Sequence, residues 1–280
     1  MKAKKALGQN WLISESAIAK IIEAGRVTQA DLVLEIGPGQ GVLTEKLLAT
    51  GCQVIAVEKD AELIPALTKK FSNELESKRL ILLNEDILNF DLTHQNFAKQ
   101  THPNFVQQNL GGQDLSGQET KYHIPNTTYK LVANIPYYLT GQIIRQFLTT
   151  TNPPSLMVLM LQKEVAERIA RDKKESLLSL SVKAYGQAHY VKTVPAGSFR
   201  PIPKVDSAIL LIDQISRQHF SDVKMESKFF DLLHRGFSHK RQLLKNNLGL
   251  SAEQLEVCGI PAKARAENLS LADWLCLLKI

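Results

Sequence analysis

The stretch Val33–Leu48, VLEIGPGQGVLTEKLL, joins a predicted buried strand, a glycine-rich turn and the start of a helix within sixteen residues. An apolar run with β-branched side chains ends at Ile36, which is typical of a buried parallel strand. A helix is predicted from the apolar spacing that begins at Val42, and Gly51 is expected to end it. Between them, three glycines let the backbone turn sharply and approach a ligand where a Cβ atom would collide: Gly37, Gly39 and Gly41. This order predicts a nucleotide-binding fold, although glycines also mark ordinary tight turns.

A second predicted strand, Gln53–Val57, ends at Glu58, about twenty residues beyond the glycines, which is the spacing of a ribose-binding carboxylate. Such a side chain can accept hydrogen bonds from both ribose hydroxyl groups. The glycine spacing is G-x-G-x-G, not the G-x-G-x-x-G of dinucleotide-binding folds. The sequence therefore favours an adenosine-containing ligand other than a nicotinamide dinucleotide.

A third predicted strand, Leu80–Leu83, leads into an acidic loop that contains Asp86. Acidic loop residues are usually only polar surface, but the carboxyl ends of parallel strands meet at one edge of an open α/β sheet. We therefore expect Asp86 to lie near the glycine turn and Glu58, where its carboxylate can contact an adenine.

The segment Asn134–Tyr138, NIPYY, follows a fourth predicted strand, Tyr129–Ala133. It could be only a turn, in which proline fixes the backbone and Asn134 closes a local hydrogen bond. It also presents an amide oxygen, a main-chain carbonyl and an aromatic face together at a strand end. Such a group suits the exocyclic amine of a flat base, which is hydrogen-bonded at its N–H groups and stacked on its ring.

Three further strands are predicted in the second half of the chain: 156–161, 190–194 and 208–212. No helix is expected between the last two, so they should be antiparallel neighbours, and we predict a parallel sheet closed at its end by one antiparallel strand. The proline-rich connection between them can hold Phe199 over the ligand-binding edge; the alternative is that Phe199 only fills the core.

The apolar residues from Gln214 onward follow helical spacing only, which predicts a sheet domain, 1–213, and a helical domain, 214–280. The polar segment 93–128 lacks periodicity, and we interpret it as an inserted surface loop. In the helical domain, the run 234–248 contains no acidic residue. Its lysines and arginines are Arg235, Lys240, Arg241 and Lys245. This run suits phosphate contact, although charge runs are usually solvated helix faces.

The composition is that of a globular protein of one large and one small domain, with 280 residues, 44% hydrophobic residues and a net charge of +6. The charge fits either a polyanionic partner or a merely basic surface. No apolar run approaches the roughly 18 residues of a membrane helix, and no signal-peptide segment is evident, so we expect a cytoplasmic protein without membrane association. Three cysteines, Cys52, Cys258 and Cys276, are too few and too scattered for a disulfide framework or a zinc site, and no metal is expected.

Six motifs occur in an order that resembles the ribosomal-RNA adenine N6,N6-dimethyltransferases: LGQNWL, EIGPGQGVLT, VEKD, NEDIL, NIPYYLT and SFRPIPKVDSA. The similarity covers most of the chain outside 93–128. The later segments RGFSHKRQLLKNNL and RAENLSLADW resemble the small-subunit (16S) branch more than the large-subunit, macrolide-resistance branch. The resemblance implies an α/β fold with a seven-stranded Rossmann-like methyltransferase sheet and a small C-terminal helical domain. It also implies S-adenosylmethionine as methyl donor and, as substrate, two adjacent adenosines near the 3′ end of 16S rRNA in immature 30S particles.

The resemblance also assigns roles to individual residues. The implied cofactor-binding residues are Asn10, Leu12, Gly37, Gly39, Glu58, Asp86, Ile87 and Asn134. Asn134 and the carbonyl of Ile135 are expected to bind the target amine, with Tyr137 and Phe199 on either side of the base. This chain departs from the family pattern at Trp11, where a phenylalanine is usual, in its less arginine-rich SHKRQ segment, and in the length of 93–128.

No side chain in these motifs resembles a covalent nucleophile with its base, so catalysis is expected to depend mainly on orientation. Two acceptors that hold the N–H groups of an adenine amine can aim its lone pair at a methyl donor. The alternatives are a large-subunit or other adenine methyltransferase, and a cofactor-binding rRNA chaperone in which catalysis is incidental. A monomer is expected.

Overall fold

The computed structural model describes residues 4, 8–90 and 128–280, so the predicted inserted loop lies outside the described residues except for its last position. The contacts divide the chain into two compact units. Unit 1 contains 1–163 and 191–211, and unit 2 contains 164–190 and 212–280. This division differs from the expected single boundary after residue 213, because the segment 164–190 packs with the C-terminal helices.

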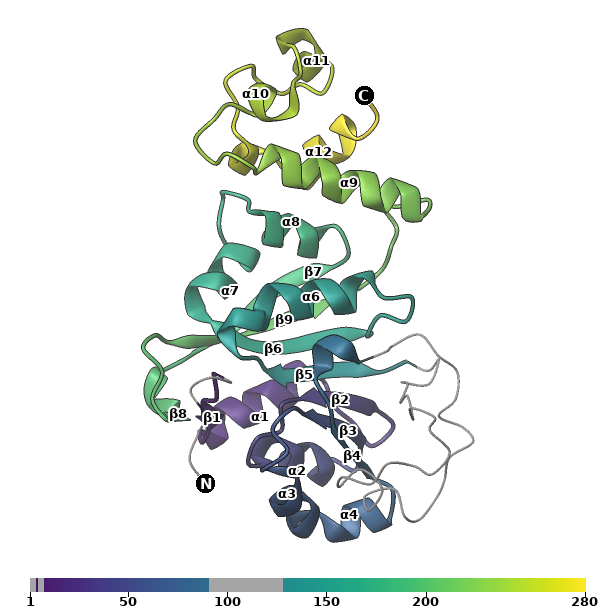
Figure 1. Ribbon diagram of the computed structural model, residues 1–280, viewed down its shortest axis with the longest axis vertical. Coiled ribbons are helices and arrows are strands. Elements are labelled where there is room, and N and C mark those ends of the chain that lie inside the picture. Colours follow the sequence, from purple (N-terminus) through teal and green to yellow (C-terminus); the bar gives the residue numbers. More distant parts are fainter. Residues whose placement is uncertain (1–3, 5–7, 91–127) are drawn as a thin grey trace. The chain divides into compact units, whose positions relative to one another are not determined.

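Seven strands form the main sheet in the order β4-β3-β2-β5-β6-β9-β7 (Figure 1). Their bounds are β2 Leu32–Ile36, β3 Gln53–Glu58, β4 Leu80–Asn84, β5 Lys130–Asn134, β6 Leu156–Gln162, β7 Gln187–Val194 and β9 Ser207–Asp213. The strands β4, β3, β2, β5 and β6 pair in parallel. The expected α/β fold with a seven-stranded sheet is therefore confirmed, and the carboxyl ends of its parallel strands share one edge.

The sequence analysis predicted a parallel sheet closed at its end by one antiparallel strand, but the last strand of the chain, β9, is not at the edge of the sheet. β9 lies between β6 and β7, and β7 is the edge strand. The burial pattern gives the reason, because six of the seven residues of β9 are buried whereas β7 has exposed residues along its length. The antiparallel relation of β7 and β9 is as expected: His189 near the start of β7 contacts Asp213 at the end of β9, and Ala196 just beyond β7 contacts Asp206 just before β9.

Helices of unit 1 cover the sheet: α1 Glu15–Ala24, α2 Val42–Ala49, α3 Ile64–Lys70, α4 Ser72–Glu76 and α6 Thr140–Thr149. Apolar side chains of α1 and α2 join those of the strands in one buried cluster. α3 begins at Ile64, and Pro65 occupies its first turn, where its missing N–H costs no helical hydrogen bond. The Asp60 carboxylate accepts hydrogen bonds from the backbone of Glu62 and from the Lys4 side chain.

A second, two-stranded sheet joins the N-terminal segment to a distant part of unit 1. β1 (Trp11–Leu12) pairs antiparallel with β8 (Phe199–Arg200), and Leu12 lies opposite Phe199 (Figure 1). Two-residue strands have no periodicity, so sequence analysis did not predict them. This pairing fixes the residues around Trp11 beside Phe199.

Unit 2 is built mainly from helices: α7 Lys163–Ala170, α8 Leu177–Lys183, α9 Val223–Gly236, α10 Leu244–Leu248, α11 Ala252–Glu256 and α12 Leu271–Leu277. Tyr185, which follows α8, packs against Phe220 and Phe230 and donates a hydrogen bond to Glu226. These contacts are the physical reason why 164–190 belongs with the C-terminal helices.

Two of the three cysteines form a disulfide, although the sequence analysis judged them too few and too scattered for a disulfide framework. Cys258, just after α11, forms a disulfide with Cys276 in α12, with their Cα atoms 5.8 Å apart. The packing of these two short helices brings together residues that are eighteen positions apart in the sequence, and spacing alone does not reveal such packing. Cys52 is buried and unpaired.

Within the described parts of the chain, no helix is long and apolar enough to cross a membrane. The same residues contain no group of three or more histidine, cysteine, aspartate or glutamate side chains that could hold a metal ion.

Candidate active site

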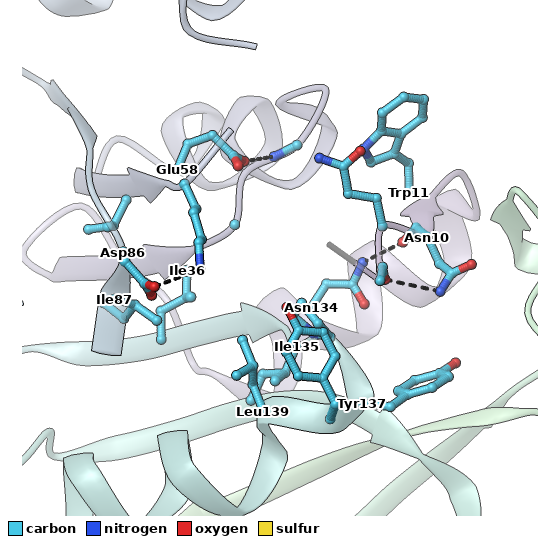
Figure 2. A pocket seen from close by; sticks show the side chains of 18 of the residues that line it. Asn10, Trp11, Ile36, Glu58, Asp86, Ile87, Asn134, Ile135, Tyr137 and Leu139 are labelled. Carbon is cyan, nitrogen blue, oxygen red and sulfur yellow. Dashed lines mark hydrogen bonds and ion pairs between the residues drawn. The ribbon is translucent and has the colours of Figure 1, made fainter. Parts of the chain in front are cut away.

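A pocket opens at the carboxyl edge of the parallel strands, entirely within unit 1 (Figure 2). Its walls come from the N-terminal segment, the glycine turn, the ends of β3, β4 and β5, and β8. The lining includes all but one of the pocket residues expected from the sequence: Asn10, Gly37, Gly39, Glu58, Asp86, Ile87, Asn134, Ile135, Tyr137 and Phe199. The exception is Leu12, whose side chain is buried in the apolar core instead.

The three glycines of the turn have positive φ angles of 67°, 59° and 74° but different surroundings. A Cβ atom on Gly41 would lie 2.5 Å from the Phe71 ring, and one on Gly39 would lie 2.9 Å from Cδ1 of Trp11. On the Cβ side of Gly37 no atom lies within 4 Å. Gly39 and Gly41 thus make room for aromatic side chains of the protein, whereas the space beside Gly37 is open, and the approach of the glycine backbone to a ligand stays a prediction.

Glu58 stands at the end of β3 and is only 6% exposed. Its Oε2 accepts the Gly39 N–H at 3.0 Å, and its Oε1 accepts the Asp60 N–H at 2.8 Å. Burial raises the pKa of this carboxyl group, while the two backbone donors act in the opposite direction. A carboxylate has about four lone-pair sites, so Glu58 can hold the glycine turn and still accept hydrogen bonds from a ligand.

Glu35, in β2 below the glycine turn, is a buried carboxyl group to which the sequence analysis gave no role. It is 1% exposed, and its Oε2 has no hydrogen-bond partner. Desolvation raises its pKa to about 8, and the nearby charge of Glu58 acts in the same direction. Glu35 is therefore mainly protonated at neutral pH. An acidic residue within an otherwise apolar strand was the available signal.

Asp86 lies beyond the end of β4, where Figure 2 shows it on the same side of the pocket as Glu58. Its Oδ1 accepts the Leu88 N–H at 3.1 Å, and its Oδ2 pairs with Nζ of Lys59 at 2.7 Å. Partial burial disfavours the charged form, but the hydrogen bonds from Lys59 and Leu88 prevail and lower the pKa of Asp86. Sequence analysis missed Lys59, which also lines the pocket, because a single lysine in a loop carries no pattern.

Asn134 ends β5 and is anchored across the pocket to the N-terminal segment. Its Nδ2 donates to the Asn10 carbonyl at 2.9 Å (Figure 2). Because the NH2 group makes this bond, the amide oxygen is the atom of Asn134 that can accept a proton from a ligand. The neighbouring Ile135 is fixed by donation of its N–H to the Met160 carbonyl.

Tyr137 and Phe199 supply aromatic surface to the same pocket. The Tyr137 hydroxyl lies 2.9 Å from Oγ of Ser207, the first residue of β9, and partial burial raises its pKa. Phe199 is 1% exposed yet lines the pocket, so it both fills the core and forms part of the pocket wall. The core-filling alternative for Phe199 is thus realised, and its position over a bound ligand stays a prediction.

The basic residues expected to contact RNA lie in unit 2, around the end of α9 and the start of α10. Lys240 and Arg241 are exposed in the turn between these helices, and Lys245 is half-buried in α10. Arg235 differs, because its Nη2 donates to the Leu248 carbonyl at 2.7 Å and so ties α9 to the end of α10. Asn247 holds the same turn by donating to the carbonyls of Gly236 and His239.

The pocket thus combines a glycine turn and two carboxyl groups with an amide, a main-chain carbonyl and aromatic rings, an arrangement that suits a methyltransferase acting on a base. The family model described as ribosomal RNA adenine dimethylase matches residues 1–280. A curated relative from Dehalococcoides mccartyi, named Ribosomal RNA small subunit methyltransferase A, is 41% identical over 99% of this chain and 88% of its own. The chain belongs to the ribosomal RNA adenine dimethylase family and is a methyltransferase.

Two solved structures support the same fold. A dimethyladenosine transferase from Plasmodium falciparum has a TM-score of 0.71 and 25% identity, and the match covers 95% of each chain. The 23S rRNA methyltransferase ErmE has a TM-score of 0.68 and 21% identity, with 96% of this chain and 98% of that one covered. The second likeness concerns the fold alone.

Proposed function

We propose that this enzyme uses S-adenosylmethionine to dimethylate the N6 amines of two adjacent adenosines near the 3′ end of 16S rRNA, acting on immature 30S particles. The observation that carries the proposal is the convergence of Glu58 and Asp86 with Asn134, Ile135 and Tyr137 on one pocket. The family and the small-subunit names of the curated relatives support this substrate. We further propose that the enzyme acts as a monomer in the cytoplasm.

The residues present fit S-adenosylmethionine. Open space beside Gly37 admits a ligand, and Glu58 keeps lone pairs for the ribose hydroxyl groups. Asp86 can accept from the adenine amine, and the buried Ile87 beside it offers an apolar contact. Asn10 and Asn134, joined by a hydrogen bond, stand on the wall that suits the methionine end. When bound, this cofactor supplies an electrophilic methyl group.

The chain's own contribution to the reaction is to position the target amine. The Asn134 oxygen and the Ile135 carbonyl accept its two N–H groups, which favours a pyramidal nitrogen and directs its lone pair away from the ring. Tyr137 and Phe199 hold the base by its faces, and the bond from Tyr137 to Ser207 limits movement of the phenol ring. Preorganisation of this kind can lower a barrier by several kcal/mol without a covalent intermediate.

Methyl transfer from labelled S-adenosylmethionine to immature 30S particles, compared with 50S precursors, tests the proposal. We expect label on 30S particles and recovery of N6,N6-dimethyladenosine from their 16S rRNA. Label on 50S precursors instead would support the large-subunit alternative. Tight particle binding without transfer would support the chaperone alternative and contradict the proposed function.

A further inference from the structure

Tyr138 is a large side chain of the pocket that the proposed reaction does not use. It follows Tyr137 directly and lines the same pocket, yet its side chain is 59% exposed. Tyr137 is partly buried and its hydroxyl group is bound to Ser207. Two consecutive tyrosines at the same pocket therefore have different environments, with the second at the pocket mouth.

The ring of Tyr138 is supported on one side by the N-terminal segment. Gly8 has a φ of 62°, and a Cβ atom there would lie 3.1 Å from Cε1 and 3.4 Å from Cδ1 of Tyr138. The backbone of Gly8 thus packs against the ring edge, and a larger residue at this position would push the ring away. An aromatic ring that is supported on one side and exposed on the other is suited to stacking on a flat partner.

A positive charge lines the same pocket as this ring. Lys59 lines the same pocket, and its side chain is about half exposed while it pairs with Asp86. The hydrogen bond to Asp86 is the main cause of the raised pKa of Lys59, and the phenol of Tyr138 contributes as well. Basic groups beside exposed aromatic rings are characteristic of sites that bind single-stranded nucleic acid.

The free-energy cost of extruding a base indicates what the Tyr138 ring can do. A base that leaves its stack to enter an active site costs a few kcal/mol, and it leaves the flanking base without its stacking neighbour. An aromatic side chain at the pocket mouth can replace that neighbour, and stacking of a base on an aromatic ring contributes about 1–3 kcal/mol.

We propose that Tyr138 stacks on the nucleobase that flanks the target adenine, and so holds a single-stranded RNA segment at the pocket mouth. This inference rests on the proposed function, because it takes RNA as the substrate. It adds a second base-binding position to the one formed by Asn134 and Tyr137.

Kinetics of the variants Tyr138→Ala and Tyr138→Phe test the proposal. For Tyr138→Ala we expect the KM for immature 30S particles to rise about 5- to 150-fold, which corresponds to the loss of one stacking contact. Because stacking needs the ring and not the hydroxyl group, Tyr138→Phe should stay within about threefold of the native enzyme. The kcat of both variants and their affinity for S-adenosylmethionine by calorimetry should change little. Val223→Ala, which removes a 70% exposed apolar side chain from α9, serves as the matched control.

A spectroscopic measurement reports stacking independently of methyl transfer. The probe is a single-stranded RNA with 2-aminopurine next to a target adenosine, on the 5′ side in one RNA and on the 3′ side in another. We expect one of the two RNAs to lose fluorescence on binding to the native enzyme and to Tyr138→Phe, and to lose less on binding to Tyr138→Ala.

Equal KM values for the native enzyme and a folded Tyr138→Ala would overturn the inference, as would equal quenching by both. An equal rise in KM for Tyr138→Ala and Tyr138→Phe would assign the effect to the hydroxyl group and would also overturn the inference. Thermal unfolding of each variant establishes that it is folded. If the native enzyme transfers no methyl group to 30S particles, the proposed function fails, whereas the quenching experiment still decides whether Tyr138 stacks on a base.

Discussion

The pocket of unit 1 and the basic residues of unit 2 were both expected to bind parts of the same reaction complex, but they are built differently. These basic residues, Arg235, Lys240, Arg241 and Lys245, lie around the turn between α9 and α10 and are called the basic turn below. In the pocket, Glu58, Asp86 and Asn134 are each held by hydrogen bonds to the protein. In the basic turn, Lys240 and Arg241 are exposed, and only Arg235 is tied to a carbonyl group. Chemistry requires fixed atoms, whereas attraction of a polyanion requires only charge at the surface. Four experiments test whether this difference in construction is a difference in function.

The largest effect is expected at Asn134. Asn134→Ala removes an acceptor for the target amine and should lower turnover about a hundredfold or more, because alignment is lost. Methyl transfer to immature 30S particles measures this, and Asn73→Ala, an exposed amide in α4, is the control. Turnover within a few-fold of the native enzyme would show that this amide does not position the amine.

Glu58 should affect cofactor binding and stability together. Glu58→Ala removes charge-assisted hydrogen bonds of about 1.5–3 kcal/mol, so affinity for S-adenosylmethionine should fall about 10- to 150-fold. It also leaves the N–H groups of Gly39 and Asp60 without this partner, which should lower the free energy of unfolding. Calorimetric titration and denaturant unfolding measure the two effects. Unchanged cofactor affinity in a folded variant would place the ribose elsewhere.

The basic turn should act through salt dependence. Replacement of Lys240, Arg241 and Lys245 by glutamine should flatten the slope of log affinity against log salt by about 2 to 3, because each phosphate contact contributes roughly 0.7–0.9. Cofactor affinity should not change. Arg235→Gln should instead lower thermal stability, since it breaks the bond to Leu248. Filter binding of 30S particles at increasing salt gives the slope, and an unchanged slope would assign RNA docking to another surface.

The fourth test concerns pH and the buried Glu35. Its folded-state pKa of about 8 lies above the ordinary value of 4.5, so between these values the unfolded chain is ionised while the folded protein keeps the proton. Stability should therefore fall as pH rises through this window, by at most about 1.4 kcal/mol per pH unit, and become level above it. Glu35→Gln should remove this part of the slope.

Denaturant unfolding at pH 5, 6.5 and 8 measures the effect of Glu35. Glu256→Gln, an exposed position in α11, is the control and should leave the slope unchanged. Parallel pH profiles for the native protein and Glu35→Gln would mean that Glu35 ionises freely in the folded state.

The pocket could be predicted because its residues sit at the ends of parallel strands. A strand that ends at Glu58 and another that ends at Asn134 must bring both residues to one sheet edge, whatever their distance along the chain. The apolar runs predicted the strands, and the glycines and proline predicted the turns between them. Sequence reasoning therefore reached both the fold and most of the pocket lining.

Features that depend on contacts between distant segments could not be predicted in this way. The pairing of Leu12 with Phe199, the ion pair of Lys59 with Asp86 and the disulfide of Cys258 leave no periodic trace in the sequence. The position of β9 inside the sheet was missed because the order along the chain suggested an edge. Arg235 was grouped with its basic neighbours because charge alone does not show which side chains hold the protein together.

The different neighbours of the three glycines bear on how such a motif tolerates mutation over evolution. Gly39 faces the indole of Trp11, and Gly41 faces the ring of Phe71, so each is linked to the size of one particular side chain. Gly37 faces open space and is constrained by its backbone angle alone. Three letters that look equivalent in the sequence should therefore respond differently to substitution: Gly39 through its contact with Trp11, Gly41 through its contact with Phe71, and Gly37 through its backbone angle alone.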